Sequence, residues 1–265
     1  MSNGRSGALD GIMGQGVITV GPALAVVMAG LIVVGAAVAA IGQLGVSRAI
    51  VTASLRAIVQ LAVVSLLITA VLRSWWATAA FIAVMLGVAA VTSARRVSTV
   101  RLAWPVVAPI AAGALPVGVG IVASGTMPLT TVAVLPIAGI LIGGAMTATS
   151  LAGRRALDEL RNRYGEYEAA LALGFTPRDA ALEVCRPTAG QALVPALDQT
   201  RTVGLVTLPG AFVGVLLGGG SAVQAGATQL LVLVALLAVE AIAAAITLEL
   251  VARGVLRRTP GAMHR

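Results

Sequence analysis

Long stretches without any charged residue separate short clusters of arginine along most of this chain. The hydrocarbon core of a bilayer is about 30 Å thick, so a helix needs about 20 apolar residues to cross it. On this basis we predict seven transmembrane helices, near residues 17–44, 57–72, 74–94, 102–123, 129–152, 203–217 and 227–251. The predicted fold class is an all-α, polytopic membrane protein.

The predicted helices divide the chain into three parts. Residues 1–16 form an N-terminal tail, residues 17–251 form the transmembrane domain, and residues 252–265 form a C-terminal tail. Inside the transmembrane domain, residues 154–201 form a long charged region with seven Arg and seven Asp or Glu. We predict that this region lies outside the lipid, as water-exposed helices.

The arginines determine the predicted orientation. With the N-terminus outside the cell, only Arg5 and Arg73 lie outside, and the other sixteen of the eighteen Arg residues lie inside. Cytoplasmic loops of membrane proteins carry the excess of positive charge. The sequence therefore predicts a cytoplasmic C-terminus, a cytoplasmic 154–201 region and a place in the inner (cytoplasmic) membrane as a multi-pass protein.

Composition excludes an ordinary cytosolic enzyme, a secreted disulfide scaffold and a disordered chain. Hydrophobic residues make up 58% of the chain and charged residues 11%, whereas soluble domains have about 25% charged residues. The net charge of +8 follows from the cytoplasmic arginines, so the expected partner is the lipid bilayer and no nucleic acid.

The chain contains no Lys, one Cys (Cys185) and one His (His264). The absence of Lys excludes a P-loop that binds ATP and a Ser-Lys dyad. No HExxH motif and no Cys-His pair is present. We therefore expect a chain that is not an enzyme and binds no cofactor itself, and its metal ligands, if any, are unknown.

The charged region has the start and stop signals of a helical hairpin. A helix from about residue 155 to 173 would end at Gly174, which suits a left-handed C-terminal cap. Thr176 and Pro177 fit the N-cap and first position of a second helix, which we expect to end before Pro187. A short helix between two such breaks is suited to docking onto a protein outside the lipid.

The spacing within this hairpin is specific. Glu168-Ala169-Ala170 is followed after three residues by Gly174 and after nine more by Val184-Cys185-Arg186-Pro187. This resembles the E-A-A motif of ABC-transporter permeases, with Arg186 at a position where Leu is usual. The resemblance implies that a cytoplasmic ABC ATPase subunit docks here. The implied coupling residues are Glu168, Ala169, Ala170, Gly174, Thr176, Pro177, Val184 and Pro187.

Other segments extend the resemblance. They are residues 56–61, residues 136–146, the Leu173–Pro177 turn and the stretch TVGLVTLPG at 202–210. Over about residues 45–250 the chain resembles the FetB-type permease family, which includes bacterial iron-export permeases and plant aluminium-tolerance permeases. It departs from that family at Gly144, where Asn is usual.

The resemblance implies a function. The chain would be the permease subunit of a metal (iron) exporter, a homodimer working with two copies of a separate ATPase that binds ATP and Mg. The sequence leaves the cargo, the direction of transport and the dimer interface open.

Few polar groups lie inside the predicted spans. Glu240 is near the middle of the last one, where an ionisable residue is costly. It could bind a cation, carry a proton, or remain protonated and hydrogen-bonded to a neighbouring helix. A proton-coupled secondary transporter that uses Glu240 is therefore the alternative function. Besides Glu240, the candidate residues of a transport path are Gln60, Thr147, Thr149 and Gln229.

Glycines at four-residue spacing predict close helix packing. Gly139 and Gly143 form one such pair, and Gly210, Gly214 and Gly218 form a double one. The sequence leaves open whether they pack within the chain or between two chains.

Overall fold

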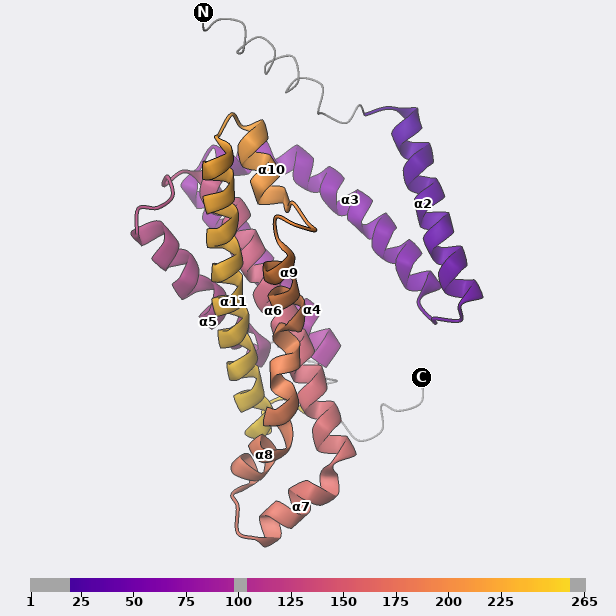
Figure 1. Cartoon of the computed structure of the whole chain (residues 1–265), viewed down its shortest axis with the longest axis vertical. Coiled ribbons are helices and arrows are strands. Elements are labelled where there is room, and N and C mark those ends of the chain that lie inside the picture. The colour runs from indigo at the N-terminus through magenta and orange to yellow at the C-terminus, as the bar shows by residue number, and fades with distance from the viewer. Residues whose placement is uncertain (1–19, 98–103, 258–265) are drawn as a thin grey trace, which may run out of the picture. The chain divides into compact units, whose positions relative to one another are not determined.

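The computed structural model describes residues 20–97 and 104–257, which are almost entirely helical (Figure 1). The chain divides into two compact units, one ending at Val71 and the other beginning at Leu72. Predictions for the 1–16 tail, for Arg101 and for residues 258–265 lie outside the described residues.

Six helices in the described ranges are long and apolar enough to cross a bilayer. They are α2 (Pro22–Ile41), α3 (Ser47–Leu72), α4 (Trp75–Val97), α5 (Trp104–Ala123), α6 (Thr131–Asn162) and α11 (Ala222–Ala252). The predicted fold class, an all-α polytopic membrane protein, is confirmed.

The predicted span at 203–217 differs from the structure. Only its second half is helical, as α10 (Gly210–Leu217), and the residues before it contain an isolated bridge between Val203 and Thr207. Gly204 there has a φ of 80°, and Pro209 has no N–H to continue a helix. The prediction of one continuous helix here is therefore wrong.

The first unit is a pair of helices, α2 and α3. The turn between them uses left-handed backbone at Gln43 and Gly45, and the Leu44 N–H donates to the carbonyl of Ala39 at 3.0 Å. Within α3 no residue is buried, and α2 buries only Ala39. Such exposed apolar surface is typical of helices in contact with lipid or with another protein.

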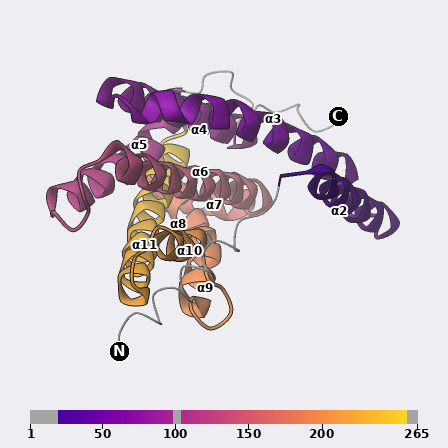
Figure 2. The ribbon, with the colours of Figure 1, turned by 90° about the horizontal axis from the view of Figure 1, so that it is seen from above.

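The second unit is built around α6, which contacts α4, α5 and α11 (Figure 2). Ile110 of α5, Leu141 of α6 and Val239 of α11 are completely or almost completely buried in its core. Two hydroxyl groups join α4 to α6, with Ser93 Oγ lying 2.9 Å from Ser150 Oγ. The remaining elements are α7 (Tyr164–Ala172), α8 (Pro177–Ala189), the 3-10 helix η1 (Gly190–Leu193), α9 (Val194–Thr202) and α10.

Close approaches between helices occur mainly at glycines other than those predicted. A Cβ atom placed on Gly113 would lie 2.8 Å from the backbone oxygen of Val239, and one placed on Gly153 would lie 2.6 Å from Val97. Of the predicted set, Gly139 meets Met85 of α4. Gly143, Gly210 and Gly214 have no such neighbour within 4 Å, and Gly218 meets only carbonyls of its own helix. For these four, packing against another chain stays a prediction.

Gly113 gives a direct test of this packing. Gly113→Ala should lower the free energy of unfolding by about 1–3 kcal/mol, because a backbone atom of α11 cannot move aside as a side chain would. Gly120→Ala on the same helix is the control, since it meets nothing within 4 Å. Thermal unfolding in detergent would compare them, and equal midpoints for the two variants would contradict the close contact of α5 with α11.

Candidate functional site

The charged region forms a helical hairpin at the end of the long helices where Arg95 and Arg96 close α4. The predicted helix over residues 155–173 is in fact two helices. The first part is the continuation of α6 to Asn162, and the second part is α7, with a bend at Arg163 between them. This bend lets α7 fold back beside α8 instead of continuing along the axis of α6.

Arg163 holds the bend in place. Its guanidinium donates to the Glu166 carboxylate, and its Nη1 donates to the backbone oxygen of Val184 in α8 at 3.1 Å. The hydrogen bond to Arg163 lowers the pKa of Glu166, and the same bond raises the pKa of Arg163. Both groups therefore remain charged through the neutral pH range, and one side chain ties together α6, α7 and α8.

The tip between α7 and α8 is a Schellman turn. Gly174 has a φ of 91°, and the Phe175 N–H donates to the Ala170 oxygen at 3.1 Å. Thr176 then caps α8 by accepting from the Asp179 N–H at 3.2 Å. The predicted roles of Gly174, Thr176 and Pro177 as helix stop, cap and first residue agree with these positions. Leu173 and Phe175 at the tip are exposed, at 80% and 46%.

The two helices of the hairpin differ in burial. No residue of α7 is buried, and Glu168 and Ala169 of the E-A-A motif face outward. In contrast, α8 buries Ala181, Leu182 and Val184. The first two of these pack on Ala252 of α11. In this hairpin α7 and the tip are therefore exposed, whereas α8 is packed against the long helices.

Cys185 belongs to the buried face of α8. Its Sγ donates to the Ala156 oxygen of α6 at 3.4 Å, and burial raises its thiol pKa to about 11. The thiol therefore stays protonated and poorly reactive. Pro187 lies two residues further on, inside α8, so the expectation that the helix ends before it is wrong. The α-helix continues to Ala189, and the chain then forms the 3-10 helix η1 from Gly190.

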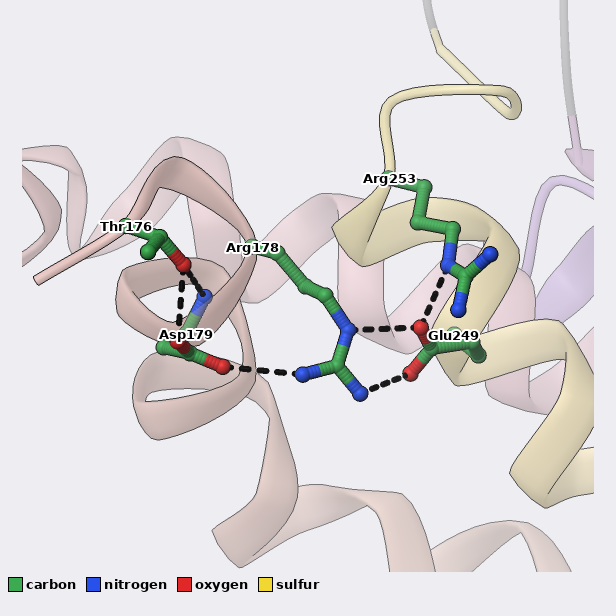
Figure 3. A network of polar contacts seen from close by, with 5 residues as sticks. All are labelled: Thr176, Arg178, Asp179, Glu249 and Arg253. Carbon is green, nitrogen blue, oxygen red and sulfur yellow. Dashed lines mark hydrogen bonds and ion pairs between the residues drawn. The ribbon is translucent and has the colours of Figure 1, made fainter.

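An ion-pair network joins α8 to the end of α11 (Figure 3). Arg178 donates to both oxygens of Glu249, through Nε at 2.6 Å and Nη2 at 2.8 Å. Arg253 donates to the same carboxylate, and Arg178 Nη1 also pairs with Asp179 at 2.9 Å. The hydrogen bond to Glu249 raises the pKa of Arg178. Such a two-point contact fixes direction as well as distance.

Sequence reasoning missed this network. Glu249 and Arg253 have the i, i+4 spacing of a helical ion pair, which the sequence does show. Arg178, however, is 71 residues from Glu249, and no periodicity connects them. Arg163 was missed for the same reason, because its bond to Val184 depends on how the hairpin folds back.

Glu240 of α11 is a predicted path residue that lies buried against α6. Its exposed fraction is 7%, and a Cβ placed on Gly144 of α6 would lie 3.1 Å from its Oε1. Since Gly144 has no side chain, the carboxyl group has room beside α6. A larger residue at position 144 would have to displace both Glu240 and Leu236.

The other predicted path residues do not gather around Glu240. Gln229 is buried and caps α10, because its Oε1 accepts from the Phe212 N–H at 3.3 Å. Thr147 is exposed on α6 and bonds the Gly143 oxygen, whereas the hydroxyl of Thr149 is buried with no hydrogen-bond partner. Gln60 belongs to α3, in the other unit. Over residues 20–97 and 104–257 there is no group of three His, Cys, Asp or Glu side chains that could hold a metal ion.

Comparison with known proteins identifies the family. The model of the uncharacterised protein family UPF0014 matches residues 23–256. The chain belongs to this family. Proteins similar to it include Protein ALUMINUM SENSITIVE 3 of Arabidopsis thaliana, 41% identical over 40% of this chain and 39% of that protein.

Two bacterial relatives are also similar to this UPF0014 chain. The UPF0014 membrane protein YjkA of Bacillus subtilis is 35% identical over 57% of this chain and 61% of its own. The probable iron export permease protein FetB of Escherichia coli is 35% identical over 45% of this chain and 48% of its own. The chain spans about two fifths of the length of the plant relatives it matches. No solved structure matches it. The family and the six apolar helices together make this a multi-pass membrane protein.

Proposed function

We propose that this chain is the membrane subunit of an ATP-driven metal exporter and that a separate cytoplasmic ATPase docks on its α7–α8 hairpin. The observation that carries the proposal is the two-sided hairpin. One helix, α7, is wholly without buried residues, while the other is fixed to the long helices by apolar packing and by Arg178.

The surface that the ATPase would contact combines charge with apolar side chains. Glu168 supplies a carboxylate, and Leu173 and Phe175 supply apolar groups at the tip. Exposed large apolar residues rimmed by charge are typical of protein interfaces. A push on this surface would reach α11 through Arg178 and Glu249, and α6 through Arg163.

The cargo is proposed from the name of one relative. The relative in Escherichia coli is named a probable iron export permease, and we propose a metal cation, iron first, as the substrate. A homodimer with two ATPase copies, each with its own ATP and Mg, is the assembly that such permeases imply.

Reversal of one charge tests the docking surface. Glu168→Arg should weaken binding of the cognate ATPase about tenfold, because it places like charge where the partner offers a complementary one. Pull-down from membranes and ATP-dependent loss of iron from loaded vesicles would measure it. Glu183→Arg makes the same charge change at an exposed position of α8 that the motif leaves unspecified, and is the control. Binding and export equal to the unsubstituted protein at normal expression would contradict the proposal.

The tip gives a second arm of that experiment. Gly174→Pro removes the N–H that bonds the Leu171 oxygen at 3.0 Å and cannot take a φ of 91°, so docking should be lost. Gly174→Asn can adopt the left-handed conformation and should retain docking.

The buried carboxyl of Glu240 favours a second candidate, a secondary transporter driven by protons. This candidate predicts metal flux in vesicles that carry an imposed pH gradient and no ATPase, and predicts that Glu240→Gln abolishes it. Gln keeps the shape of the side chain and removes the titratable proton. Flux that needs the ATPase and ignores the gradient would exclude this candidate and support the first.

A further inference from the structure

The segment between α8 and α11 rises along α11 toward the opposite end of the long helices. At its start, Ala192 of η1 packs with Ala152 and Ala244. Near its end, the Phe212 N–H of α10 donates to Gln229 of α11. Ala244 and Gln229 are 15 residues apart on one helix, which is about 22 Å at 1.5 Å per residue. Between these two levels lie α9 and the non-helical residues before α10 (Figure 1).

The basic end of α4 marks where the lipid core ends on that side. Val97, directly after Arg95 and Arg96, and Thr247 of α11 both approach Gly153 of α6. Thr247 is therefore level with these arginines. Measured along α11 from Thr247 toward the opposite end of the helix, Ala244 lies nearly one turn away. Gln229 lies about 27 Å away in the same direction. By this measure, α9 and the residues that follow it run at the depth of the hydrocarbon core.

This position revises the sequence-based assignment of residues 190–201 to the cytoplasm. The earlier part of the charged region, through α8, does lie at the basic end of the long helices. Its last part folds back along α11. The sequence did not predict this, because α9 carries charges of both signs, as a water-exposed helix would.

The exposed face of α9 is charged. The side chains of Asp198 and Arg201 are 60% and 70% exposed and lie 3.5 Å apart. The opposite face of α9 has small and apolar side chains, and its Ala196 is buried. The helix contacts α11. A charged pair at this depth is strongly disfavoured in contact with lipid tails.

The residues after α9 have irregular backbone. Its hydrogen bonds are those of a turn: the Thr202 oxygen accepts from the Leu205 and Val206 N–H groups, and the Gly204 N–H donates to the Thr207 oxygen at 2.9 Å. Leu205 and Val206 are 91% and 77% exposed. Irregular backbone at membrane depth is tolerated where protein buries it or where it lines a water-filled cavity.

We propose that the Asp198–Arg201 face of α9 and the unwound residues 203–209 line a water-filled path through the membrane. This deepens the function proposed above and rests on it, since the path would carry the metal ion. The groups on this face are the Asp198 carboxylate with its partner Arg201, threonine hydroxyls and backbone carbonyl oxygens, and the oxygen atoms among them suit a hydrated cation. Broken helices that expose carbonyls at mid-depth serve ions in the same way in other transporters.

Labelling of introduced cysteines can test this path, because the chain has only one cysteine of its own, Cys185. Cys185→Ser gives a chain without thiols, into which Asp198→Cys or Thr207→Cys is placed one at a time. Val234→Cys is the matched control, because Val234 lies on α11 between the two reference levels and is 54% exposed. The full-length protein in native membrane vesicles is treated with a positively charged, membrane-impermeant methanethiosulfonate. Only the thiolate reacts, and thiolates form in water.

The proposal predicts that Asp198→Cys and Thr207→Cys react at least tenfold faster than Val234→Cys. Equally slow reaction of all three would overturn it. Disulfide cross-linking between two copies of Asp198→Cys, together with slow labelling, would also overturn it, because the face would then be packed against a second copy.

This experiment separates the path from the ATPase. Labelling requires no ATPase, so fast labelling without ATPase binding would support the path and contradict only the docking proposal. Slow labelling with normal ATPase binding would overturn the path and leave the docking proposal standing.

Discussion

The contact between Arg178 and Glu249 is the constraint on which this account of the hairpin depends. It is a two-point contact between a helix outside the apolar bundle and the last turns of α11. Apolar packing of α8 gives attraction with little direction, whereas a guanidinium that meets both oxygens of a carboxylate fixes orientation. Arg253 holds the same carboxylate from its own helix. Any movement of the hairpin would thereby be passed to the helix that also carries Glu240.

The hairpin and the rising segment are parts of one arrangement. Starting at Arg163, the chain turns back through α7, is fixed along α8, and then climbs beside α11 through η1, α9 and α10. Each turn has a local cause: the bonds of Arg163, the left-handed Gly174, and the break at Gly204 and Pro209. A displaced α8 would therefore shift the charged face of α9 relative to α11, which would connect the proposed docking surface with the proposed path.

Much of the fold can be predicted from the sequence because lipid imposes simple rules. Charge-free stretches identified six helices, and the Gly174 and Thr176 signals located the end of α7 and the start of α8. The capping box of Ser221 and Gln224 is equally visible in the sequence, and it explains why α11 begins before the predicted residue 227. The helix over 203–217 was wrong because apolar composition does not reveal a backbone break, although Pro209 marks one.

The site was harder to predict than the fold. Its decisive contacts join residues distant in sequence, as Arg178 with Glu249 and Arg163 with Val184. The predicted glycine pairs followed spacing alone, whereas real close approaches depend on which face of α5 or α6 meets α11. Gln229 was expected among path residues, yet its amide caps α10. Spacing finds helices and their ends, and three-dimensional packing decides what each polar group does.

The most direct measurement compares ATP hydrolysis with metal export in vesicles that contain the complete complex. In the Arg178→Met variant, which keeps the stem of the side chain and loses its charge, we predict that ATP hydrolysis continues while export falls at least tenfold. Arg154→Met, the same change at an exposed position of α6 outside the hairpin, should leave both unchanged. Export at the unsubstituted rate in the Arg178→Met complex would contradict the claim that the hairpin acts on α11 through this contact.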